Sequence, residues 1–188
     1  MVMISNQWYI LVSASLVAAV FDVRTGRIPN GLTVPLAVLG MGSSLWFGGP
    51  RGLGESILVM ILLALPFFIM FALGHGGGGD VKMMGAIGTW VGIYHGLIVL
   101  AMVCISGGIL ALLRMITLKE RRSLFINLFG TLYLLLVALL SGKKGWKLLR
   151  ADPKDQNKAL TAGATIPYGV AIFIGVCLST GLVYYEIV

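Results

Sequence analysis

Apolar residues in this chain are grouped in long stretches that are interrupted only by short segments rich in glycine, proline or charge. The hydrocarbon core of a bilayer is about 30 Å thick, and about 20 apolar residues cross it as a helix. The pattern therefore predicts an all-α, polytopic integral membrane helix bundle with about six transmembrane helices, at residues 8–21, 32–47, 56–73, 81–93, 97–115 and 166–185. An unbroken helix from 81 to 115 would be about 52 Å long, too long for one crossing, so we expect a break at residues 92–96.

Composition points to the same class of protein. The chain has 188 residues, of which 58% are hydrophobic and only 11% are charged. No soluble domain of this size needs so much apolar surface. We therefore expect a single membrane-embedded domain over residues 1–188, without a soluble appendage.

The basic residues predict the orientation of the helices. With six crossings and the N-terminus outside, all of the 14 basic residues except Arg51 lie on the cytoplasmic side, as the positive-inside rule requires. This arrangement requires residues 124–140 to form an interfacial or re-entrant helix, although the stretch is long enough to cross. A seventh crossing there remains an alternative, and it would leave the topology of residues 1–122 unchanged.

Two carboxylates, Asp22 and Asp80, lie at the ends of apolar stretches. An Asp at the centre of a transmembrane helix costs about 2.5–3.5 kcal/mol, so acids in such segments are usually functional. Two crossings separate the two positions along the chain, which returns Asp80 to the membrane face that holds Asp22. The other five of the seven acidic residues lie in solvated or outer segments. Parity therefore predicts that Asp22 and Asp80 share the cytoplasmic boundary.

A pair of carboxylates at one face suggests an aspartyl hydrolase. Two close carboxyl groups cannot both ionise easily, so they share a proton; the charged one can act as general base toward water. The protonated one can polarise the carbonyl group that is cut. Each acid also has a simpler interpretation: Asp80 could cap a helix beginning at Val81, and Asp22 could pair with Arg24 or Arg27.

A glycine run precedes Asp80, formed by Gly76, Gly77, Gly78 and Gly79. It could be a flexible linker, or it could let an extended substrate backbone approach the carboxylate closely. The run is not a phosphate-binding loop, because no Gly-Lys-Ser/Thr follows it. Lys82 either extends to the interface or tunes the charge of Asp80.

Other kinds of catalytic site are not indicated. His75 and His95 fall on opposite sides of the membrane in this topology, and the chain has no C-x-x-C spacing. A Gly-x-Ser-x-Gly motif is also absent. We therefore expect no metal and no cofactor.

These motifs resemble those of a known family. The segment Gly77-Gly78-Gly79-Asp80-Val81-Lys82 resembles the G-x-G-D-x-K motif of type IV prepilin peptidases, the membrane aspartyl proteases of the Gly-x-Gly-Asp type. Asp22 followed by Ile28-Pro29-Asn30 is similar to the first motif of that family. Residues 85–92 and Ile166-Pro167-Tyr168-Gly169 resemble its later helices.

The resemblance implies that Asp22 and Asp80 are the catalytic pair. It also implies that Ile28, Pro29 and Asn30, with the glycine run and Lys82, form loop or substrate-binding positions. The implied substrate is a prepilin or pseudopilin whose short basic leader ends in Gly and is cut after it, at the cytoplasmic face of the cytoplasmic (inner) membrane. The expected partners are this substrate and membrane lipid, and nucleic acid is not expected; the oligomeric state is left open.

The chain resembles the small, peptidase-only branch of the family, of the tight-adherence pilus or preflagellin type. Larger members carry a domain with two C-x-x-C pairs and methylate the new N-terminus, so methyl transfer is not expected here. Two alternatives remain: a small proton- or cation-coupled transporter, and a pilus-assembly scaffold without enzymatic activity. Neither accounts for both motifs.

Overall fold

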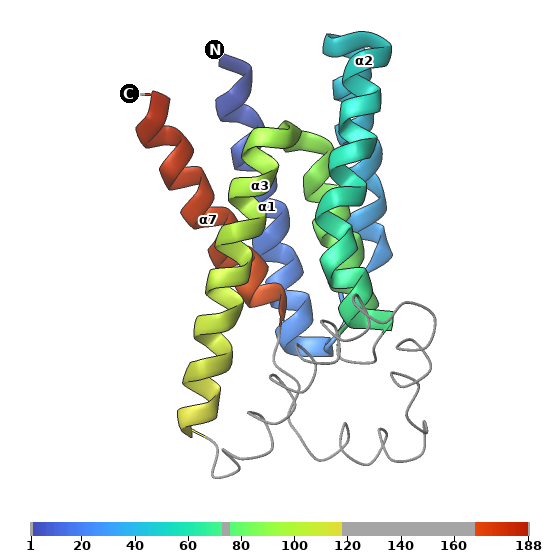
Figure 1. The fold of residues 1–188 in the computed structure, drawn as a ribbon. Coiled ribbons are helices and arrows are strands. Elements are labelled where there is room, and N and C mark those ends of the chain that lie inside the picture. The colour runs from blue at the N-terminus through green and yellow to red at the C-terminus, as the bar shows by residue number, and fades with distance from the viewer. Residues whose placement is uncertain (1, 73–75, 118–167, 188) are drawn as a thin grey trace, which may run out of the picture. The chain divides into compact units, whose positions relative to one another are not determined.

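The structure is a computed structural model, and it describes residues 2–72, 76–117 and 168–187 (Figure 1). These residues form four helices and no strand: α1 (Val2–Thr25), α2 (Asn30–Ala72), α3 (Gly78–Thr117) and α7 (Tyr168–Ile187). The prediction of an all-α protein is confirmed for them. The chain divides into two compact units, Met1–Gly108 with Pro167–Val188, and Ile109–Ile166, and all contacts discussed below belong to the first.

The helices α2 and α3 each contain one sharp bend, where the ribbon reverses direction (Figure 1). Gly49 in α2 has φ 61° and ψ −156°, and Gly92 in α3 has φ 64° and ψ 173°. A positive φ is accessible to glycine at little cost, whereas a side chain would be strained there. Each of these two helices therefore contains two of the predicted transmembrane segments. The predicted break at residues 92–96 begins at Gly92.

The prediction of about six transmembrane helices is not confirmed. In the described residues, four helices are long and apolar enough to cross a membrane, because α2 and α3 continue through their bends without a separate loop. The stretch 124–140, for which an interfacial or re-entrant helix was expected, lies outside the described residues.

A polar network supports the bend in α3. The Glu55 side chain accepts a hydrogen bond from the Ile93 backbone N–H at 3.3 Å, directly after Gly92. The hydroxyl groups of Ser44 and Ser56 each donate to the backbone oxygen of Thr89 at 3.1 Å. These bonds satisfy backbone groups that a bend leaves without helical partners, which matters most in an apolar environment.

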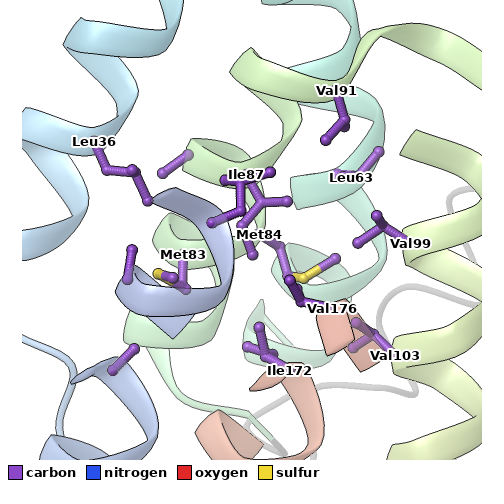
Figure 2. Close-up of a cluster of buried hydrophobic side chains, with 14 of the residues drawn as sticks. Leu36, Leu63, Met83, Met84, Ile87, Val91, Val99, Val103, Ile172 and Val176 are labelled. Atoms are coloured by element: carbon purple, nitrogen blue, oxygen red, sulfur yellow. The ribbon is translucent and has the colours of Figure 1, made fainter. Parts of the chain in front are cut away.

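Side chains from α2, α3 and α7 meet in one hydrophobic core (Figure 2). The labelled members of this cluster are Leu36, Leu63, Met83, Met84, Ile87, Val91, Val99, Val103, Ile172 and Val176. Small residues allow the backbones to approach closely, as is common between membrane helices. A Cβ atom built on Gly175 of α7, for example, would lie 2.6 Å from the Cα atom of Val103 in α3. The core thus fixes the start of α3 against α2 and α7.

The outer surfaces of the helices are apolar. Large hydrophobic side chains such as Val38, Leu39, Leu58 and Ile61 are more than half exposed. A soluble protein rarely displays so much apolar surface. With the length and apolar composition of the four helices, this exposure identifies an integral membrane protein.

Candidate active site

Asp22 lies in the last turn of α1 and is half-buried. The helix ends at Thr25, because Gly26 adopts a left-handed φ of 63° and its N–H donates to the backbone oxygen of Asp22 at 2.8 Å. Glycine in this conformation is a common C-terminal cap. The chain then turns toward α2, which leaves the Asp22 side chain at the end of the helix.

Asp80 lies in the first turn of α3, and only 8% of its surface is exposed. The helix begins at Gly78, not at Val81 as expected, so Gly78 and Gly79 belong to the helix and only Gly76 and Gly77 precede it. The Asp80 N–H donates to the Gly77 oxygen at 3.1 Å. A Cβ atom built on Gly77 would lie 2.9 Å from Oδ2 of Asp80, so the glycine leaves room for the carboxyl group.

The two carboxyl groups lie close enough for their negative charges to interact. Next to Asp80 is a small cavity of about 10 Å³, whose lining also includes Phe67, Met70, Gly76, Gly77 and Tyr168. This is about the volume that one water molecule requires. The structure therefore brings the two predicted acids together. The space beside the buried acid, Asp80, is about the size of one reacting water molecule.

The remaining motif residues connect the segment that follows α1 to the start of α3. The Lys82 ammonium group donates to Oδ1 of Asn30 at 2.9 Å. Ile28 is 6% exposed, and a Cβ atom built on Gly79 would lie 3.1 Å from the Ile28 Cβ. Pro29 contributes its carbonyl oxygen, which accepts the N–H group of Leu32 at 3.1 Å in the first turn of α2. The segment 28–30 therefore packs against the start of α3 and holds the second motif beside the first.

Two residues of α7 also belong to the site, and only the family resemblance of the segment Ile166-Pro167-Tyr168-Gly169 pointed to them. The Gly169 N–H donates to Oδ2 of Asp22 at 2.7 Å, and Tyr168 lines the cavity beside Asp80. The end of α1 and the start of α7 lie next to each other (Figure 1). Apart from that resemblance, a glycine in the first turn of an apolar helix does not indicate which residue it contacts.

The described residues contain no group of three or more His, Cys, Asp or Glu side chains that could hold a metal ion. His75 lies outside them. Its possible partner, His95, contacts the ring of Trp8 edge-on, with the ring centroids 6.1 Å apart. Among the described residues, the groups at this end of the helices that bear on the chemistry of the pair include the two carboxyl groups and the Tyr168 hydroxyl.

Comparison with known proteins assigns the chain to a family. The family model of the type IV leader peptidases matches residues 9–112, a stretch that includes both aspartates. The chain belongs to the type IV leader peptidase family. This finding confirms the resemblance that the two motifs indicated.

Two curated relatives are similar to part of the chain. Prepilin leader peptidase/N-methyltransferases from two strains of Burkholderia pseudomallei are each 32% identical over 88 residues, which is 44% of this chain and 28% of theirs. The match thus spans less than a third of the length of these relatives. No solved structure matches the chain.

Proposed function

We propose that this protein is an intramembrane aspartyl endopeptidase that removes the leader peptide of prepilins or pseudopilins, cutting after a Gly. The observation that carries the proposal is the meeting of Asp22 and Asp80 at one end of apolar helices, with Asp80 buried beside a water-sized cavity. Membership of the type IV leader peptidase family supports the same activity.

The chemistry requires one ionised and one protonated carboxyl group. The ionised group takes a proton from water while the water oxygen attacks the carbonyl carbon of the peptide. The protonated group donates its proton to the carbonyl oxygen, so that a neutral tetrahedral intermediate forms. Such paired acids need close placement and different surroundings, because like charges a few Å apart cannot both ionise easily.

We place the site at the cytoplasmic face of the inner membrane. Arg24 and Arg27 follow Asp22 at the end of α1, and Lys82 follows Asp80, whereas Arg51 lies beside the Gly49 bend. Basic residues are enriched in cytoplasmic segments. A basic leader peptide would then reach the acids from the side on which it is synthesised.

The direct test is cleavage of a tagged prepilin in membranes that contain the wild-type protein or the Asp80→Asn variant. We expect the wild type to give a shorter product whose new N-terminus, read by mass spectrometry, follows the Gly of the leader. The Glu55→Gln variant serves as the control, since Glu55 lies beside the Gly92 bend and bonds Ile93 there. Intact prepilin in the wild-type membranes would refute the proposal.

Gly77→Ala should reduce the rate of cleavage by about 10²-fold, because small displacements of a catalytic group can cost that much. Its Cβ atom would lie 2.9 Å from Oδ2 of Asp80, so the carboxyl group must shift. The matched control is Gly31→Ala, whose Cβ atom would meet nothing within 4 Å. Cleavage rates are compared at equal amounts of membrane protein; equal rates for both variants would contradict the role of Gly77.

A further inference from the structure

The first turn of α7 makes a hydrogen bond to one of the two acids, Asp22. The Gly169 N–H donates to Oδ2 of Asp22 at 2.7 Å. The first N–H groups of a helix have no partners within the helix and carry the positive end of its dipole, so they stabilise an ionised carboxylate. A bond of this length is typical of a charge-assisted hydrogen bond.

The contact between Gly169 and Asp22 is also tight. A Cβ atom built on Gly169 would lie 2.8 Å from Cβ of Asp22, 3.0 Å from its Oδ2 and 3.2 Å from Cα of Ala19. A side chain at this position would therefore push the carboxyl group of Asp22 away from the α7 amide. The glycine allows the helix end to meet the acid directly.

Asp80 has different surroundings. It is 8% exposed, and the cavity beside it is lined by the apolar side chains of Phe67 and Met70 and by Tyr168. Burial disfavours a negative charge on Asp80, and the neighbouring charge of Asp22 disfavours it further. The Gly77 backbone gives the Asp80 carboxyl one hydrogen bond, which favours the ionised form but has a smaller effect than burial and the charge of Asp22. The nearest basic side chain along α3, Lys82, donates to Asn30 instead.

We propose that the first turn of α7 gives the two acids different roles. Gly169 holds Asp22 as the ionised general base, and Asp80 carries the proton. Gly169 is a positioning residue, because it acts through Asp22. This inference rests on the proposed peptidase activity and assigns the two roles within it.

The assignment gives a balanced reaction. Asp22 takes a proton from water as the water oxygen bonds to the carbonyl carbon, and Asp80 gives its proton to the carbonyl oxygen. The C–N bond of the intermediate then breaks, and Asp22 returns its proton to the departing nitrogen. One hydroxyl group of the intermediate gives its proton to Asp80 as the product acid forms. Both side chains end in their starting states.

Chemical modification can distinguish the two states without any substrate. An ionised carboxylate opens an epoxide by attack on carbon, and the released alkoxide takes a proton from water. A protonated carboxyl group transfers its proton to the carbon of a diazo compound, and the carboxylate then forms the ester as N₂ leaves. Purified protein in detergent is treated with phenyl glycidyl ether or with diazoacetamide, and the esters are located by peptide mass spectrometry.

We expect phenyl glycidyl ether to modify Asp22 at least about tenfold more than Asp80, since a hydrogen bond to a charged group contributes more than the energy equivalent of that factor. Diazoacetamide should show the opposite preference. In Gly169→Ala, epoxide modification of Asp22 should fall about tenfold. The matched control in the same helix is Gly181→Ala, whose Cβ atom would meet nothing within 4 Å.

The assignment would be overturned if, in the wild type, the epoxide modified Asp22 no more than Asp80 or did not modify Asp22 at all. This result can be obtained even if Gly169→Ala does not fold. Equal modification in the two folded glycine variants would overturn the role of Gly169. Prepilin cleavage is measured separately on the same preparations. If the peptidase proposal is wrong, prepilin is not cleaved in that measurement. If only the assignment of the two roles is wrong, prepilin is cleaved and the pattern of esters differs from the expected one.

Discussion

Asp22→Asn and Asp80→Asn are each expected to reduce prepilin cleavage by about 10⁴-fold or more, with the double variant no slower than the slower single variant. The reason is that both carboxyl groups act on the same water and the same carbonyl group. Removing either one removes the proton exchange, so the second replacement has nothing further to remove. Groups that act as a unit show this strongly non-additive behaviour.

The measurement is a time course of prepilin cleavage with enzyme in excess, for the wild type, both single variants and the double variant. Immunoblots of the membranes check that the four proteins are inserted in equal amounts. We expect equal amounts because Asn has nearly the shape of Asp. Normal cleavage by either single variant would exclude a catalytic pair. Losses that multiply in the double variant would show that the two acids act in separate steps.

The shared location of the two acids could be predicted from the sequence because membrane topology is a question of parity. An even number of crossings between Asp22 and Asp80 returns the chain to the same face, whatever the packing of the helices. The structure brings the two carboxyl groups within the range of electrostatic interaction. Their role as a catalytic pair remains a prediction.

The form of the bends could not be predicted in the same way. Apolar periodicity gives the length of a helix, but a single glycine with positive φ is enough to reverse it, and hydropathy does not distinguish such a bend from a loop. Gly92 has φ 64° and Gly49 has φ 61°, whereas many other glycines of α2 and α3 remain helical. Which glycine bends depends on tertiary partners such as Glu55, which bonds Ile93.

The hydrogen bond between α7 and Asp22 could not be predicted from the sequence for a related reason, although the start of α7 resembles a segment of the family. Gly169 and Asp22 are 147 positions apart, and Lys82 and Asn30 are 52 positions apart. A backbone N–H has no side-chain signature, so nothing in the residue types marks Gly169 as a hydrogen-bond donor to a particular acid. Contacts of this kind follow from the packing of α7 against α1, which the core side chains decide.

Gly88→Ala is expected to destabilise the protein by about 1–3 kcal/mol, the usual cost of overpacking a core. The glycine lies where α3 crosses the second half of α2. A Cβ atom there would lie 2.8 Å from the backbone oxygen of Val59, and 2.9 Å and 3.0 Å from Cα and N of Met60. These are backbone atoms that cannot rotate away, so the helices must separate. The separation would reach Met83, Met84 and Ile87, which pack in the same core (Figure 2).

The matched control for this prediction is Gly42→Ala in α2, because a Cβ atom there would meet nothing within 4 Å. In a helix interior Ala is favoured over Gly by about 0.8–1.0 kcal/mol, so this variant should be as stable as the wild type or more stable. Thermal unfolding in detergent, with the yield of monodisperse protein after size-exclusion chromatography, compares the two variants. A midpoint for Gly88→Ala at or above that of Gly42→Ala would show that α2 and α3 do not meet as closely as these distances require. Because Asp80 is carried on the same segment of α3, a folded fraction of Gly88→Ala should also cleave prepilin more slowly than Gly42→Ala does.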